Sequence, residues 1–380
     1  MNRLTRRSFL SRLGATAGAG LVLPVWLAGC GDDDDEPSGN ASGGGRGDAL
    51  RVENWPAYID EETVALFKEE TGIDLRYAES LNDNNEWFAR VQADLSAGRD
   101  IGADIAVPSS WLASRLIQLD WVQELPLDEI PNASNVVADL RNPTWDPGGR
   151  FTLPWQSGMT GIAYNIAETG RELTSVEDLF DPAFSGRIGM LTEMRDTVGL
   201  LLLGSGVDPE DATIDNAEAA FTRLEEAADS GQIRQFTGND YMDDLASGNF
   251  AACVGWSGDI SQLALDDPDL RFAIPEEGGM RWSDTMVIPS GATNLESAAR
   301  WMNYVYDPVN AARIVAYVGY NSPVEGVREE LLKDPETAPL AESPLMFPDD
   351  ETLSRLHVFA ELDEDQEGQF EERFSAITGA

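Results

Sequence analysis

The chain has 380 residues, of which 42% are hydrophobic and ten are tryptophan. This composition excludes a disordered protein and allows two domains with a large core. The net charge is -42, and the sequence contains only two lysines, Lys68 and Lys333. Nucleic acid is not an expected partner, because binding it requires basic patches that neutralise phosphates. The acidic charge fits either the attraction of a cationic ligand or general surface chemistry such as adaptation to salt.

The N-terminus has the pattern of an export signal. Arg6-Arg7-Ser8-Phe9-Leu10 is a twin-arginine pattern, and an apolar run from Leu13 to Leu27 follows it. The run ends in Leu27-Ala28-Gly29-Cys30, which resembles a lipobox. We therefore expect residues 1–29 to be a Tat signal peptide and Cys30 to be lipidated, which would anchor the protein on the outer face of the cytoplasmic membrane. The alternative is a short membrane anchor, but Pro24 interrupts the run.

The two cysteines have different expected roles. Residues 30–48 are mostly Gly, Asp, Ser and Asn, and they predict a flexible, acidic tether between the lipid and the folded body. With Cys30 lipidated, Cys253 is alone, so a disulfide within the chain is excluded. A chain without disulfides can fold in the reducing cytoplasm before Tat export.

From Ala49 the pattern alternates between strand and helix. Strands are expected at Ala49 to Trp55, Ile73 to Ala78 and Ala103 to Val107. Helices are expected from Glu61 to Thr71, with Asp60 as the N-cap and Gly72 as the stop, and from an Asn84 or Asn85 cap to Gly98. This βαβαβ order predicts an α/β fold with a parallel sheet.

The remaining chain continues with strands, helices and one long loop. The loop covers Leu125 to Gly149. Phe151 to Tyr164 is a long apolar and aromatic stretch that could carry the chain into a second domain. Strands are expected at Arg187 to Leu191, Ala251 to Trp256 and Thr285 to Pro289. Helices are expected at Thr174 to Phe180, Glu193 to Leu203, Asn216 to Ser230, Tyr241 to Ser247, Leu295 to Tyr306 and Val309 to Val318. The C-terminal part, which includes His357, is expected to be helical and acidic.

Aromatic and hydroxyl side chains follow the first three predicted strands. In parallel sheets, ligands lie beyond the carboxyl ends of the strands. The residues at these ends are Trp55 and Tyr58, then Ser80, then Ser109, Ser110 and Trp111. No glycine fingerprint lies in these turns, so they do not predict a dinucleotide site.

Two further segments pair a tryptophan with an aspartate. They are Gly255-Trp256-Ser257-Gly258-Asp259 and Arg281-Trp282-Ser283-Asp284. An aromatic face beside a carboxylate suits an organic cation, but the same pattern fits core tryptophans beside surface aspartates. Glu193 and Asp196, three residues apart, would share a face at the start of their helix. The alternative is that these two acids complement the helix macrodipole.

Taken together, the segments resemble the bacterial polyamine-binding proteins, which are the spermidine/putrescine receptors of ABC importers. The match covers nearly all of residues 49–350 and consists of Asn54–Tyr58, Asp104–Trp111, Leu191–Asp196, Gly255–Asp259, Arg281–Asp284 and Gly319–Pro323. The resemblance implies a two-lobed fold of the type II periplasmic-binding-protein class, in which each lobe is a mixed sheet flanked by helices. The ligand would lie in the interlobe cleft, which closes by a hinge. Lobe 1 would comprise residues 49–158 and 283–328, and lobe 2 residues 159–282 and 329–380.

The resemblance also implies which residues contact the ligand. Aromatic and hydroxyl residues of the cleft would be Trp55, Tyr58, Ser109, Trp111, Trp256, Trp282 and Tyr320. The carboxylates would be Glu193, Asp196, Asp259 and Asp284, with Asp284 holding an amine inside the cleft and Asp259 resembling the acid of putrescine-type members. The sequence departs from the family at Pro56, where a small hydroxyl residue is usual, and at Trp111, where a tyrosine is common. The choice between putrescine and spermidine therefore stays open.

The expected protein is a monomeric solute-binding lipoprotein that delivers a polyamine to the membrane permease subunits of an ABC transporter. We expect no cofactor, no metal and no catalytic residue. One alternative is a receptor of the same fold for another solute: iron, which Tyr317 and Tyr320 could suggest, a sugar, or an amino-acid derivative. The other is a secreted hydrolase that uses two carboxylates. The lone histidine, His357, is expected on the surface, and it argues against a histidine-based triad or zinc site.

Overall fold

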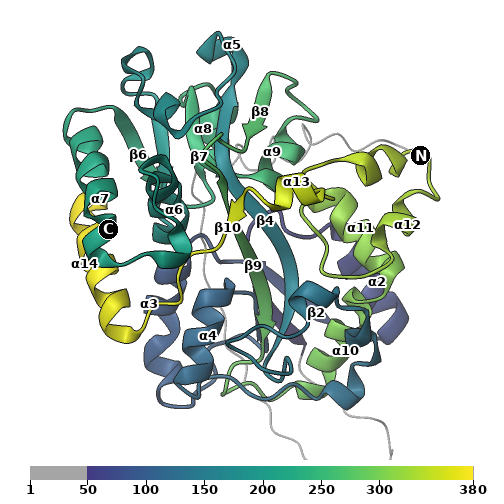
Figure 1. Cartoon of the computed structure of the whole chain (residues 1–380). Helices are drawn as coiled ribbons and strands as arrows, with labels where there is room; N and C mark the ends of the chain where they lie inside the picture. The colour runs from purple at the N-terminus through teal and green to yellow at the C-terminus, as the bar shows by residue number, and fades with distance from the viewer. Residues whose placement is uncertain (1–48, 380) are drawn as a thin grey trace, which may run out of the picture. The chain divides into compact units, whose positions relative to one another are not determined.

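The computed structural model describes residues 49–379. The predicted signal peptide, the tether and Cys30 lie outside the described residues. Within the described part, ten strands form one mixed sheet in the order β2-β1-β3-β9-β4-β7-β5-β6, while β10 pairs with β9 and β8 pairs with β4. Figure 1 shows β4 and β9 side by side in the middle of this sheet. The α/β class predicted from the sequence is confirmed.

The strands are short at both ends of the sheet and long in its centre. Their bounds are β1 Leu50–Asn54, β2 Leu75–Glu79, β3 Ile105–Ala106, β4 Thr152–Asn165, β5 Ile188–Leu191, β6 Ile233–Thr237, β7 Ala252–Trp256, β8 Leu270–Ala273, β9 Gly279–Val287 and β10 Leu356–His357. β1 pairs in parallel with β2 and with β3, as the βαβαβ pattern predicted. β4 and β9 are antiparallel.

The α-helices of the described residues connect these strands and cover the sheet. Their bounds are α2 Glu61–Thr71, α3 Asn84–Leu95, α4 Ser110–Gln118, α5 Ile166–Thr169, α6 Met194–Gly204, α7 Ile214–Asp229, α8 Tyr241–Ala246, α9 Ser257–Leu263, α10 Leu295–Val305, α11 Pro308–Val318, α12 Val327–Leu331, α13 Asp350–Leu353 and α14 Glu364–Thr378. The C-terminal α14 packs against α7 and α6, as Figure 1 shows. None of the helices in residues 49–379 combines the length and the apolar character that a membrane span requires.

The ends of α2 are those that the sequence predicts. The side chain of Asp60 accepts a hydrogen bond from the backbone N–H of Thr63, and Gly72 ends the helix with a left-handed φ of 72°. The predicted cap of α3 is wrong. Asp83 is the N-cap, because its carboxylate accepts from the N–H of Glu86, and Asn84 is the first helical residue. The Asn84 side chain is therefore available for contacts elsewhere.

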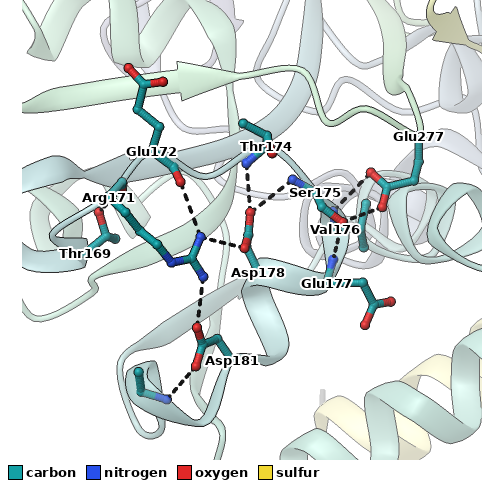
Figure 2. Close-up of polar contacts among 11 residues, drawn as sticks. Thr169, Arg171, Glu172, Thr174, Ser175, Val176, Glu177, Asp178, Asp181 and Glu277 are labelled. Carbon is teal, nitrogen blue, oxygen red and sulfur yellow. Dashed lines mark hydrogen bonds and ion pairs between the residues drawn. The ribbon is translucent and has the colours of Figure 1, made fainter.

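The segment from Thr174 to Phe180 forms a 3-10 helix, Val176–Phe180, instead of an α-helix. Ser175 starts it with a capping box, in which the Asp178 carboxylate accepts from the Ser175 backbone N–H. Figure 2 shows the same Asp178 carboxylate accepting from Thr174 N and pairing with Arg171. The distance between Arg171 Nη1 and Asp178 Oδ1 is 2.7 Å. Figure 2 also shows Glu277 accepting from the Ser175 hydroxyl. These bonds connect the short helix to the loop that precedes β9.

Two predictions about the later strands are wrong. The strand expected after Asp284 begins earlier: β9 runs from Gly279 to Val287 and includes Trp282 and Asp284. The long partner strand β4 provides the pairing, which places Trp282 opposite Gly158. His357 was expected in a helix, but it belongs to β10, which pairs with the start of β9. Its Nδ1 lies 3.1 Å from Asp208, and the ring is only partly exposed.

Candidate ligand-binding cleft

A cavity of about 1170 Å³ is lined by the carboxyl ends of several strands, the start of α6 and the C-terminal segment. Ligand pockets for small molecules reach about 1,000 Å³, so the volume suits a small solute. The residues that the sequence assigned to a cleft all line this cavity: Trp55, Tyr58, Ser109, Trp111, Glu193, Asp196, Trp256, Asp259, Trp282, Asp284 and Tyr320. Ser80, which also follows a strand, is exposed and is not among the lining residues.

Five aromatic rings form a continuous wall of edge contacts in the cavity. The ring of Trp256 lies 6.2 Å from that of Trp55 and 6.3 Å from that of Trp282, measured between centroids. The ring of Tyr320 lies 5.4 Å from that of Trp282 and 5.2 Å from that of Tyr58. Edge-to-face contacts of this kind stabilise ring orientation beyond simple burial. The wall is therefore held in place before any ligand arrives.

Two glycines make room for this wall. A Cβ atom at Gly158 would lie 2.3 Å from the ring of Trp282. A Cβ atom at Gly258 would lie 2.3 Å from the ring of Tyr320. Both glycines are needed because the two rings lie directly on the backbone. Gly258 belongs to the Trp256–Asp259 segment, so its role explains one position of that motif.

Asp284 is a buried carboxylate with hydrogen bonds but without a basic partner. It lies on β9, is 4% exposed, and accepts from the Tyr58 hydroxyl at 2.8 Å and the Ser109 hydroxyl at 2.7 Å. Within the described residues, no lysine or arginine forms an ion pair with it. Burial raises the pKa of Asp284 to about 7, although the two hydrogen bonds favour the charged form.

Asp196 and Glu193 lie at the start of α6 and make hydrogen bonds to different elements. Asp196 accepts from Thr160 Oγ1 at 2.6 Å and from the Trp256 indole N–H at 3.0 Å. Glu193 is the N-cap of α6 and accepts from both the backbone N–H and the side-chain amide of Asn84. Burial raises the pKa of Asp196 to about 6 and raises that of Glu193 well above its usual range. Both acids accept hydrogen bonds from neutral donors, and within residues 49–379 neither forms an ion pair with a lysine or arginine.

Asp259 is a further carboxylate of the cavity, and it is buried, as Glu193 and Asp284 are, whereas Asp196 is partly buried. Asp259 is 3% exposed and accepts from Asn239 Nδ2 and the Tyr241 hydroxyl, each at 3.0 Å. The Tyr320 hydroxyl donates to its other oxygen at 2.7 Å. The alternative of core tryptophans beside surface aspartates is therefore wrong, because both aspartates are buried. Glu193, Asp196 and Asp284 accept hydrogen bonds from neutral donors, so a cation in the cavity would stabilise their charged forms.

The sequence did not assign three further residues to the site: Asn84, which is not among the lining residues, and Arg195 and Glu367, which line the cavity. Asn84 donates its amide to Ser109 and to Glu193 and so connects two elements of the cavity. The guanidinium of Arg195 lies 4.1 Å from the ring centroid of Trp111 and pairs with Glu367 of α14. Arg195 lies inside a matched segment, but its partner Glu367 is 172 residues away, so no local pattern could reveal the pair. Within residues 49–379, no group of acids, cysteines and histidine has the arrangement of a metal site.

Comparison with known proteins places the chain in a family. Residues 62–347 match the model of the bacterial extracellular solute-binding protein family. The spermidine/putrescine-binding periplasmic protein 1 of Haemophilus influenzae is 25% identical over 347 residues, which are 89% of this chain and 92% of that protein. The putrescine-binding periplasmic protein PotF of Escherichia coli is 29% identical over 290 residues, covering 71% of this chain and 76% of that protein.

Solved structures agree with these relatives. A structure from Listeria monocytogenes, named for a spermidine/putrescine ABC transporter, superposes with a TM-score of 0.78 at 25% identity and covers 87% of this chain and 99% of its own. The spermidine/putrescine ABC transporter substrate-binding protein PotD of Streptococcus pneumoniae superposes with a TM-score of 0.71 at 27% identity, covering 87% and 98%. The fold is thus the mixed α/β fold of type II periplasmic binding proteins, as predicted. Since the family model covers well over half of the 380 residues, the chain belongs to the bacterial extracellular solute-binding proteins.

Proposed function

We propose that the protein captures a polyamine, putrescine or spermidine, outside the cytoplasm and delivers it to the permease of an ABC importer. One observation carries this proposal: the carboxylates of Glu193, Asp196 and Asp284 lie beside an aromatic wall, and no lysine or arginine of the described chain forms an ion pair with any of these three. A flexible dication or trication supplies the missing charges and fills the space between them with methylenes. The names of the relatives from Haemophilus influenzae and Escherichia coli support the same ligand class.

The cleft residues have complementary roles in this proposal. Asp284 holds one ammonium group through a charge-assisted hydrogen bond, with Tyr58 and Ser109 fixing its carboxylate. The faces of Trp256 and Trp282 pack against the methylenes, and each desolvated cation–π contact contributes on the order of 2 kcal/mol or less. Further ammonium groups reach the remaining acids, Glu193, Asp196 and Asp259. Trp55, Trp111 and Tyr320 complete the walls.

We also propose that the cleft closes between two lobes, residues 49–158 with 283–328 and residues 159–282 with 329–380. The topology supports this division, because β4 and β9 are the long strands that join the two ends of the sheet. Hinges are a few residues at element ends that absorb large backbone changes. Small-angle scattering with and without putrescine measures the compaction that this motion produces.

Export and anchoring complete the proposal. Arg6-Arg7-Ser8 and Leu27-Ala28-Gly29-Cys30 support Tat export and lipidation of Cys30. Cells that express the full chain are expected to incorporate labelled fatty acid into the protein and to retain it at the membrane. A Cys30→Ser variant loses the label. Labelling that survives this substitution contradicts lipidation at Cys30.

The alternatives have less support. Iron receptors use paired tyrosines, but Tyr320 donates to Asp259, and Tyr317 is not among the lining residues of the cavity. The relatives are named as binding proteins and not as hydrolases. A thermal-shift panel of diamines, polyamines, sugars and amino acids tests the ligand class. Stabilisation by putrescine or spermidine supports the proposal, whereas stabilisation by a sugar or amino acid alone contradicts it.

A further inference from the structure

Four consecutive polar residues, 82–85, lead from β2 into α3 and contact the opposite end of the sheet. β2 is the strand at one end of the sheet, whereas β5 and β6 lie at the other end. The backbone carbonyl of Asn82 accepts at 3.3 Å from the N–H of Asn239, which follows β6. The Asp83 carboxylate accepts at 2.6 Å from the hydroxyl of Thr192, which follows β5. The two ends of the sheet are therefore in contact through this segment.

The next two residues of the segment extend this contact to two helices. Asn84 donates its side-chain amide to Glu193, the N-cap of α6, at 2.8 Å. The side-chain amide of Asn85 donates to both carboxylate oxygens of Glu371 in α14, each at 3.1 Å. Each of the four residues therefore has its own partner in the part of the molecule that contains β5, β6 and α14.

The contact is close, and it consists of polar groups. A Cβ atom at Gly238, in the turn after β6, would lie 2.4 Å from the Asn82 carbonyl oxygen, so this turn requires a glycine. Each hydrogen bond contributes little net free energy, because it replaces a bond to water. Polar interfaces inside a chain allow relative motion, whereas large apolar interfaces do not. The contact is therefore of the kind that opens and closes.

We propose that residues 82–85 form a clasp that holds the cleft shut over a bound polyamine, and that Asn85 is a positioning residue for retaining the ligand. This inference rests on the proposed function and its two lobes, which place the clasp in lobe 1 and its partners in lobe 2. Asn85 is not among the lining residues of the cavity, so it acts on the ligand through the position of the lobes. An enclosed ligand leaves only after the cleft opens, so the clasp controls the dissociation rate.

Stopped-flow fluorescence of the cavity tryptophans, Trp256 and Trp282 among them, follows the release of putrescine from the protein. Asn85→Ala removes the two bonds to Glu371, and the dissociation rate is expected to rise at least about fivefold, the factor that one lost hydrogen bond produces. The association rate constant is expected to stay within about twofold, since the ligand contacts are unchanged. Damage to the site would instead slow association. An unchanged dissociation rate in the folded variant contradicts the inference.

A paired substitution tests the bond itself. Asn85→Asp places a second carboxylate against Glu371, and this repulsion is expected to speed release more than Asn85→Ala does. The double variant Asn85→Asp/Glu371→Gln exchanges donor and acceptor, so the hydrogen bond forms again and release is expected to slow. Glu371→Gln alone is the reference, because its amide oxygen still accepts from Asn85 while the charge at the cavity is lost. A double variant that releases putrescine as fast as Asn85→Asp contradicts the inference.

Gly238→Ala disturbs the clasp from the opposite side. The new methyl group would lie 2.4 Å from the Asn82 carbonyl oxygen, so the two turns must move apart. Release of putrescine is expected to be faster than from the unchanged protein. Asn249→Ala is the matched control, because Asn249 donates to Asp244 at an exposed position within one lobe. Equal acceleration in Asn249→Ala and Asn85→Ala contradicts a specific role of the clasp.

The failure of this inference differs from the failure of the proposed function. If the unchanged protein binds neither putrescine nor spermidine, the proposed function and the inference are both overturned. If it binds putrescine and the clasp variants release the ligand at the same rate as the unchanged protein, only the inference is overturned. Faster release from Asn85→Ala and Asn85→Asp, slowed again in the double variant, is the result that supports the clasp.

Discussion

The side-chain amide of Asn84 lies 2.8 Å from the carboxylate of Glu193, although the two residues are 109 positions apart. Asn84 begins α3, which follows β2 at one end of the sheet, whereas Glu193 caps α6, which follows β5 near the other end. The same amide donates to Ser109, whose hydroxyl donates to Asp284. Two acids of the cleft are thereby connected by a continuous chain of hydrogen bonds.

Replacing Asn84 with alanine is expected to weaken polyamine binding. The change removes the side-chain bonds to Glu193 and Ser109, so the Asp284 carboxylate is held less firmly. The expected loss is about 1 kcal/mol or more of binding free energy, measured by calorimetry. Asn249→Ala is the control, because Asn249 makes a comparable bond to Asp244 at an exposed position. Equal affinities of the two variants contradict a role for Asn84.

Replacing Asp284 with asparagine tests the acid with the clearest geometry. The neutral amide keeps the shape but loses the charge-assisted hydrogen bond to an ammonium group, so binding weakens by about 1.5–3 kcal/mol. Asp215→Asn is the control, because Asp215 is exposed at the start of α7. Unchanged affinity in Asp284→Asn removes this residue from the ligand site.

Polyamine affinity is expected to rise with pH between about pH 5 and about pH 8. In the free protein, desolvation raises the pKa of Asp284 to about 7 and that of Asp196 to about 6. A bound cation favours the charged carboxylates, so it lowers these pKa values and binding releases protons. At low pH, binding must first remove those protons and is weaker.

Calorimetry at several pH values, in buffers that differ in ionisation enthalpy, measures both the affinity and the proton release. The Asp284→Asn variant is expected to lose part of the pH dependence. Affinity that stays constant from pH 5 to pH 8 shows that the carboxylates are already charged in the free protein and contradicts this prediction.

Replacing Gly258 with alanine is expected to disturb the aromatic wall. The new methyl group would lie 2.3 Å from the Tyr320 ring, so the ring must move away from Trp282 and Asp259. Overpacking of this kind costs about 1–3 kcal/mol of stability. Chemical denaturation measures the loss. In α14, Gly368→Ala meets no atom within 4 Å and serves as the control. It is expected to raise stability by about 0.5–1 kcal/mol.

Local patterns predicted the elements whose ends depend on neighbouring residues. Asp60 and Gly72 bound α2 as expected, because a capping side chain and a left-handed glycine act within one turn. The cap of α3 was wrong by one or two positions, since Asp83, Asn84 and Asn85 are all able to cap. The choice depends on the contact of Asn84 with Glu193, which is a long-range interaction.

The sequence predicted which residues form the site. It did not predict the strand pairing and the side-chain contacts that connect these residues. The paired tryptophans and acids identified residues that line the cleft. The register of β9 depends on its pairing with β4, so the sequence could not place Trp282 and Asp284 inside the strand. The pairing of Arg195 with Glu367 joins α6 to the C-terminal helix, and no short-range spacing predicts it.

Calorimetric titration of the purified protein with putrescine and with spermidine, at about pH 8 where Asp284 is charged, tests the central claim most directly. Saturable binding of at least one polyamine, at one site per chain and lost or weakened in Asp284→Asn, is the predicted result. The absence of measurable binding of both polyamines to the folded protein would contradict the account.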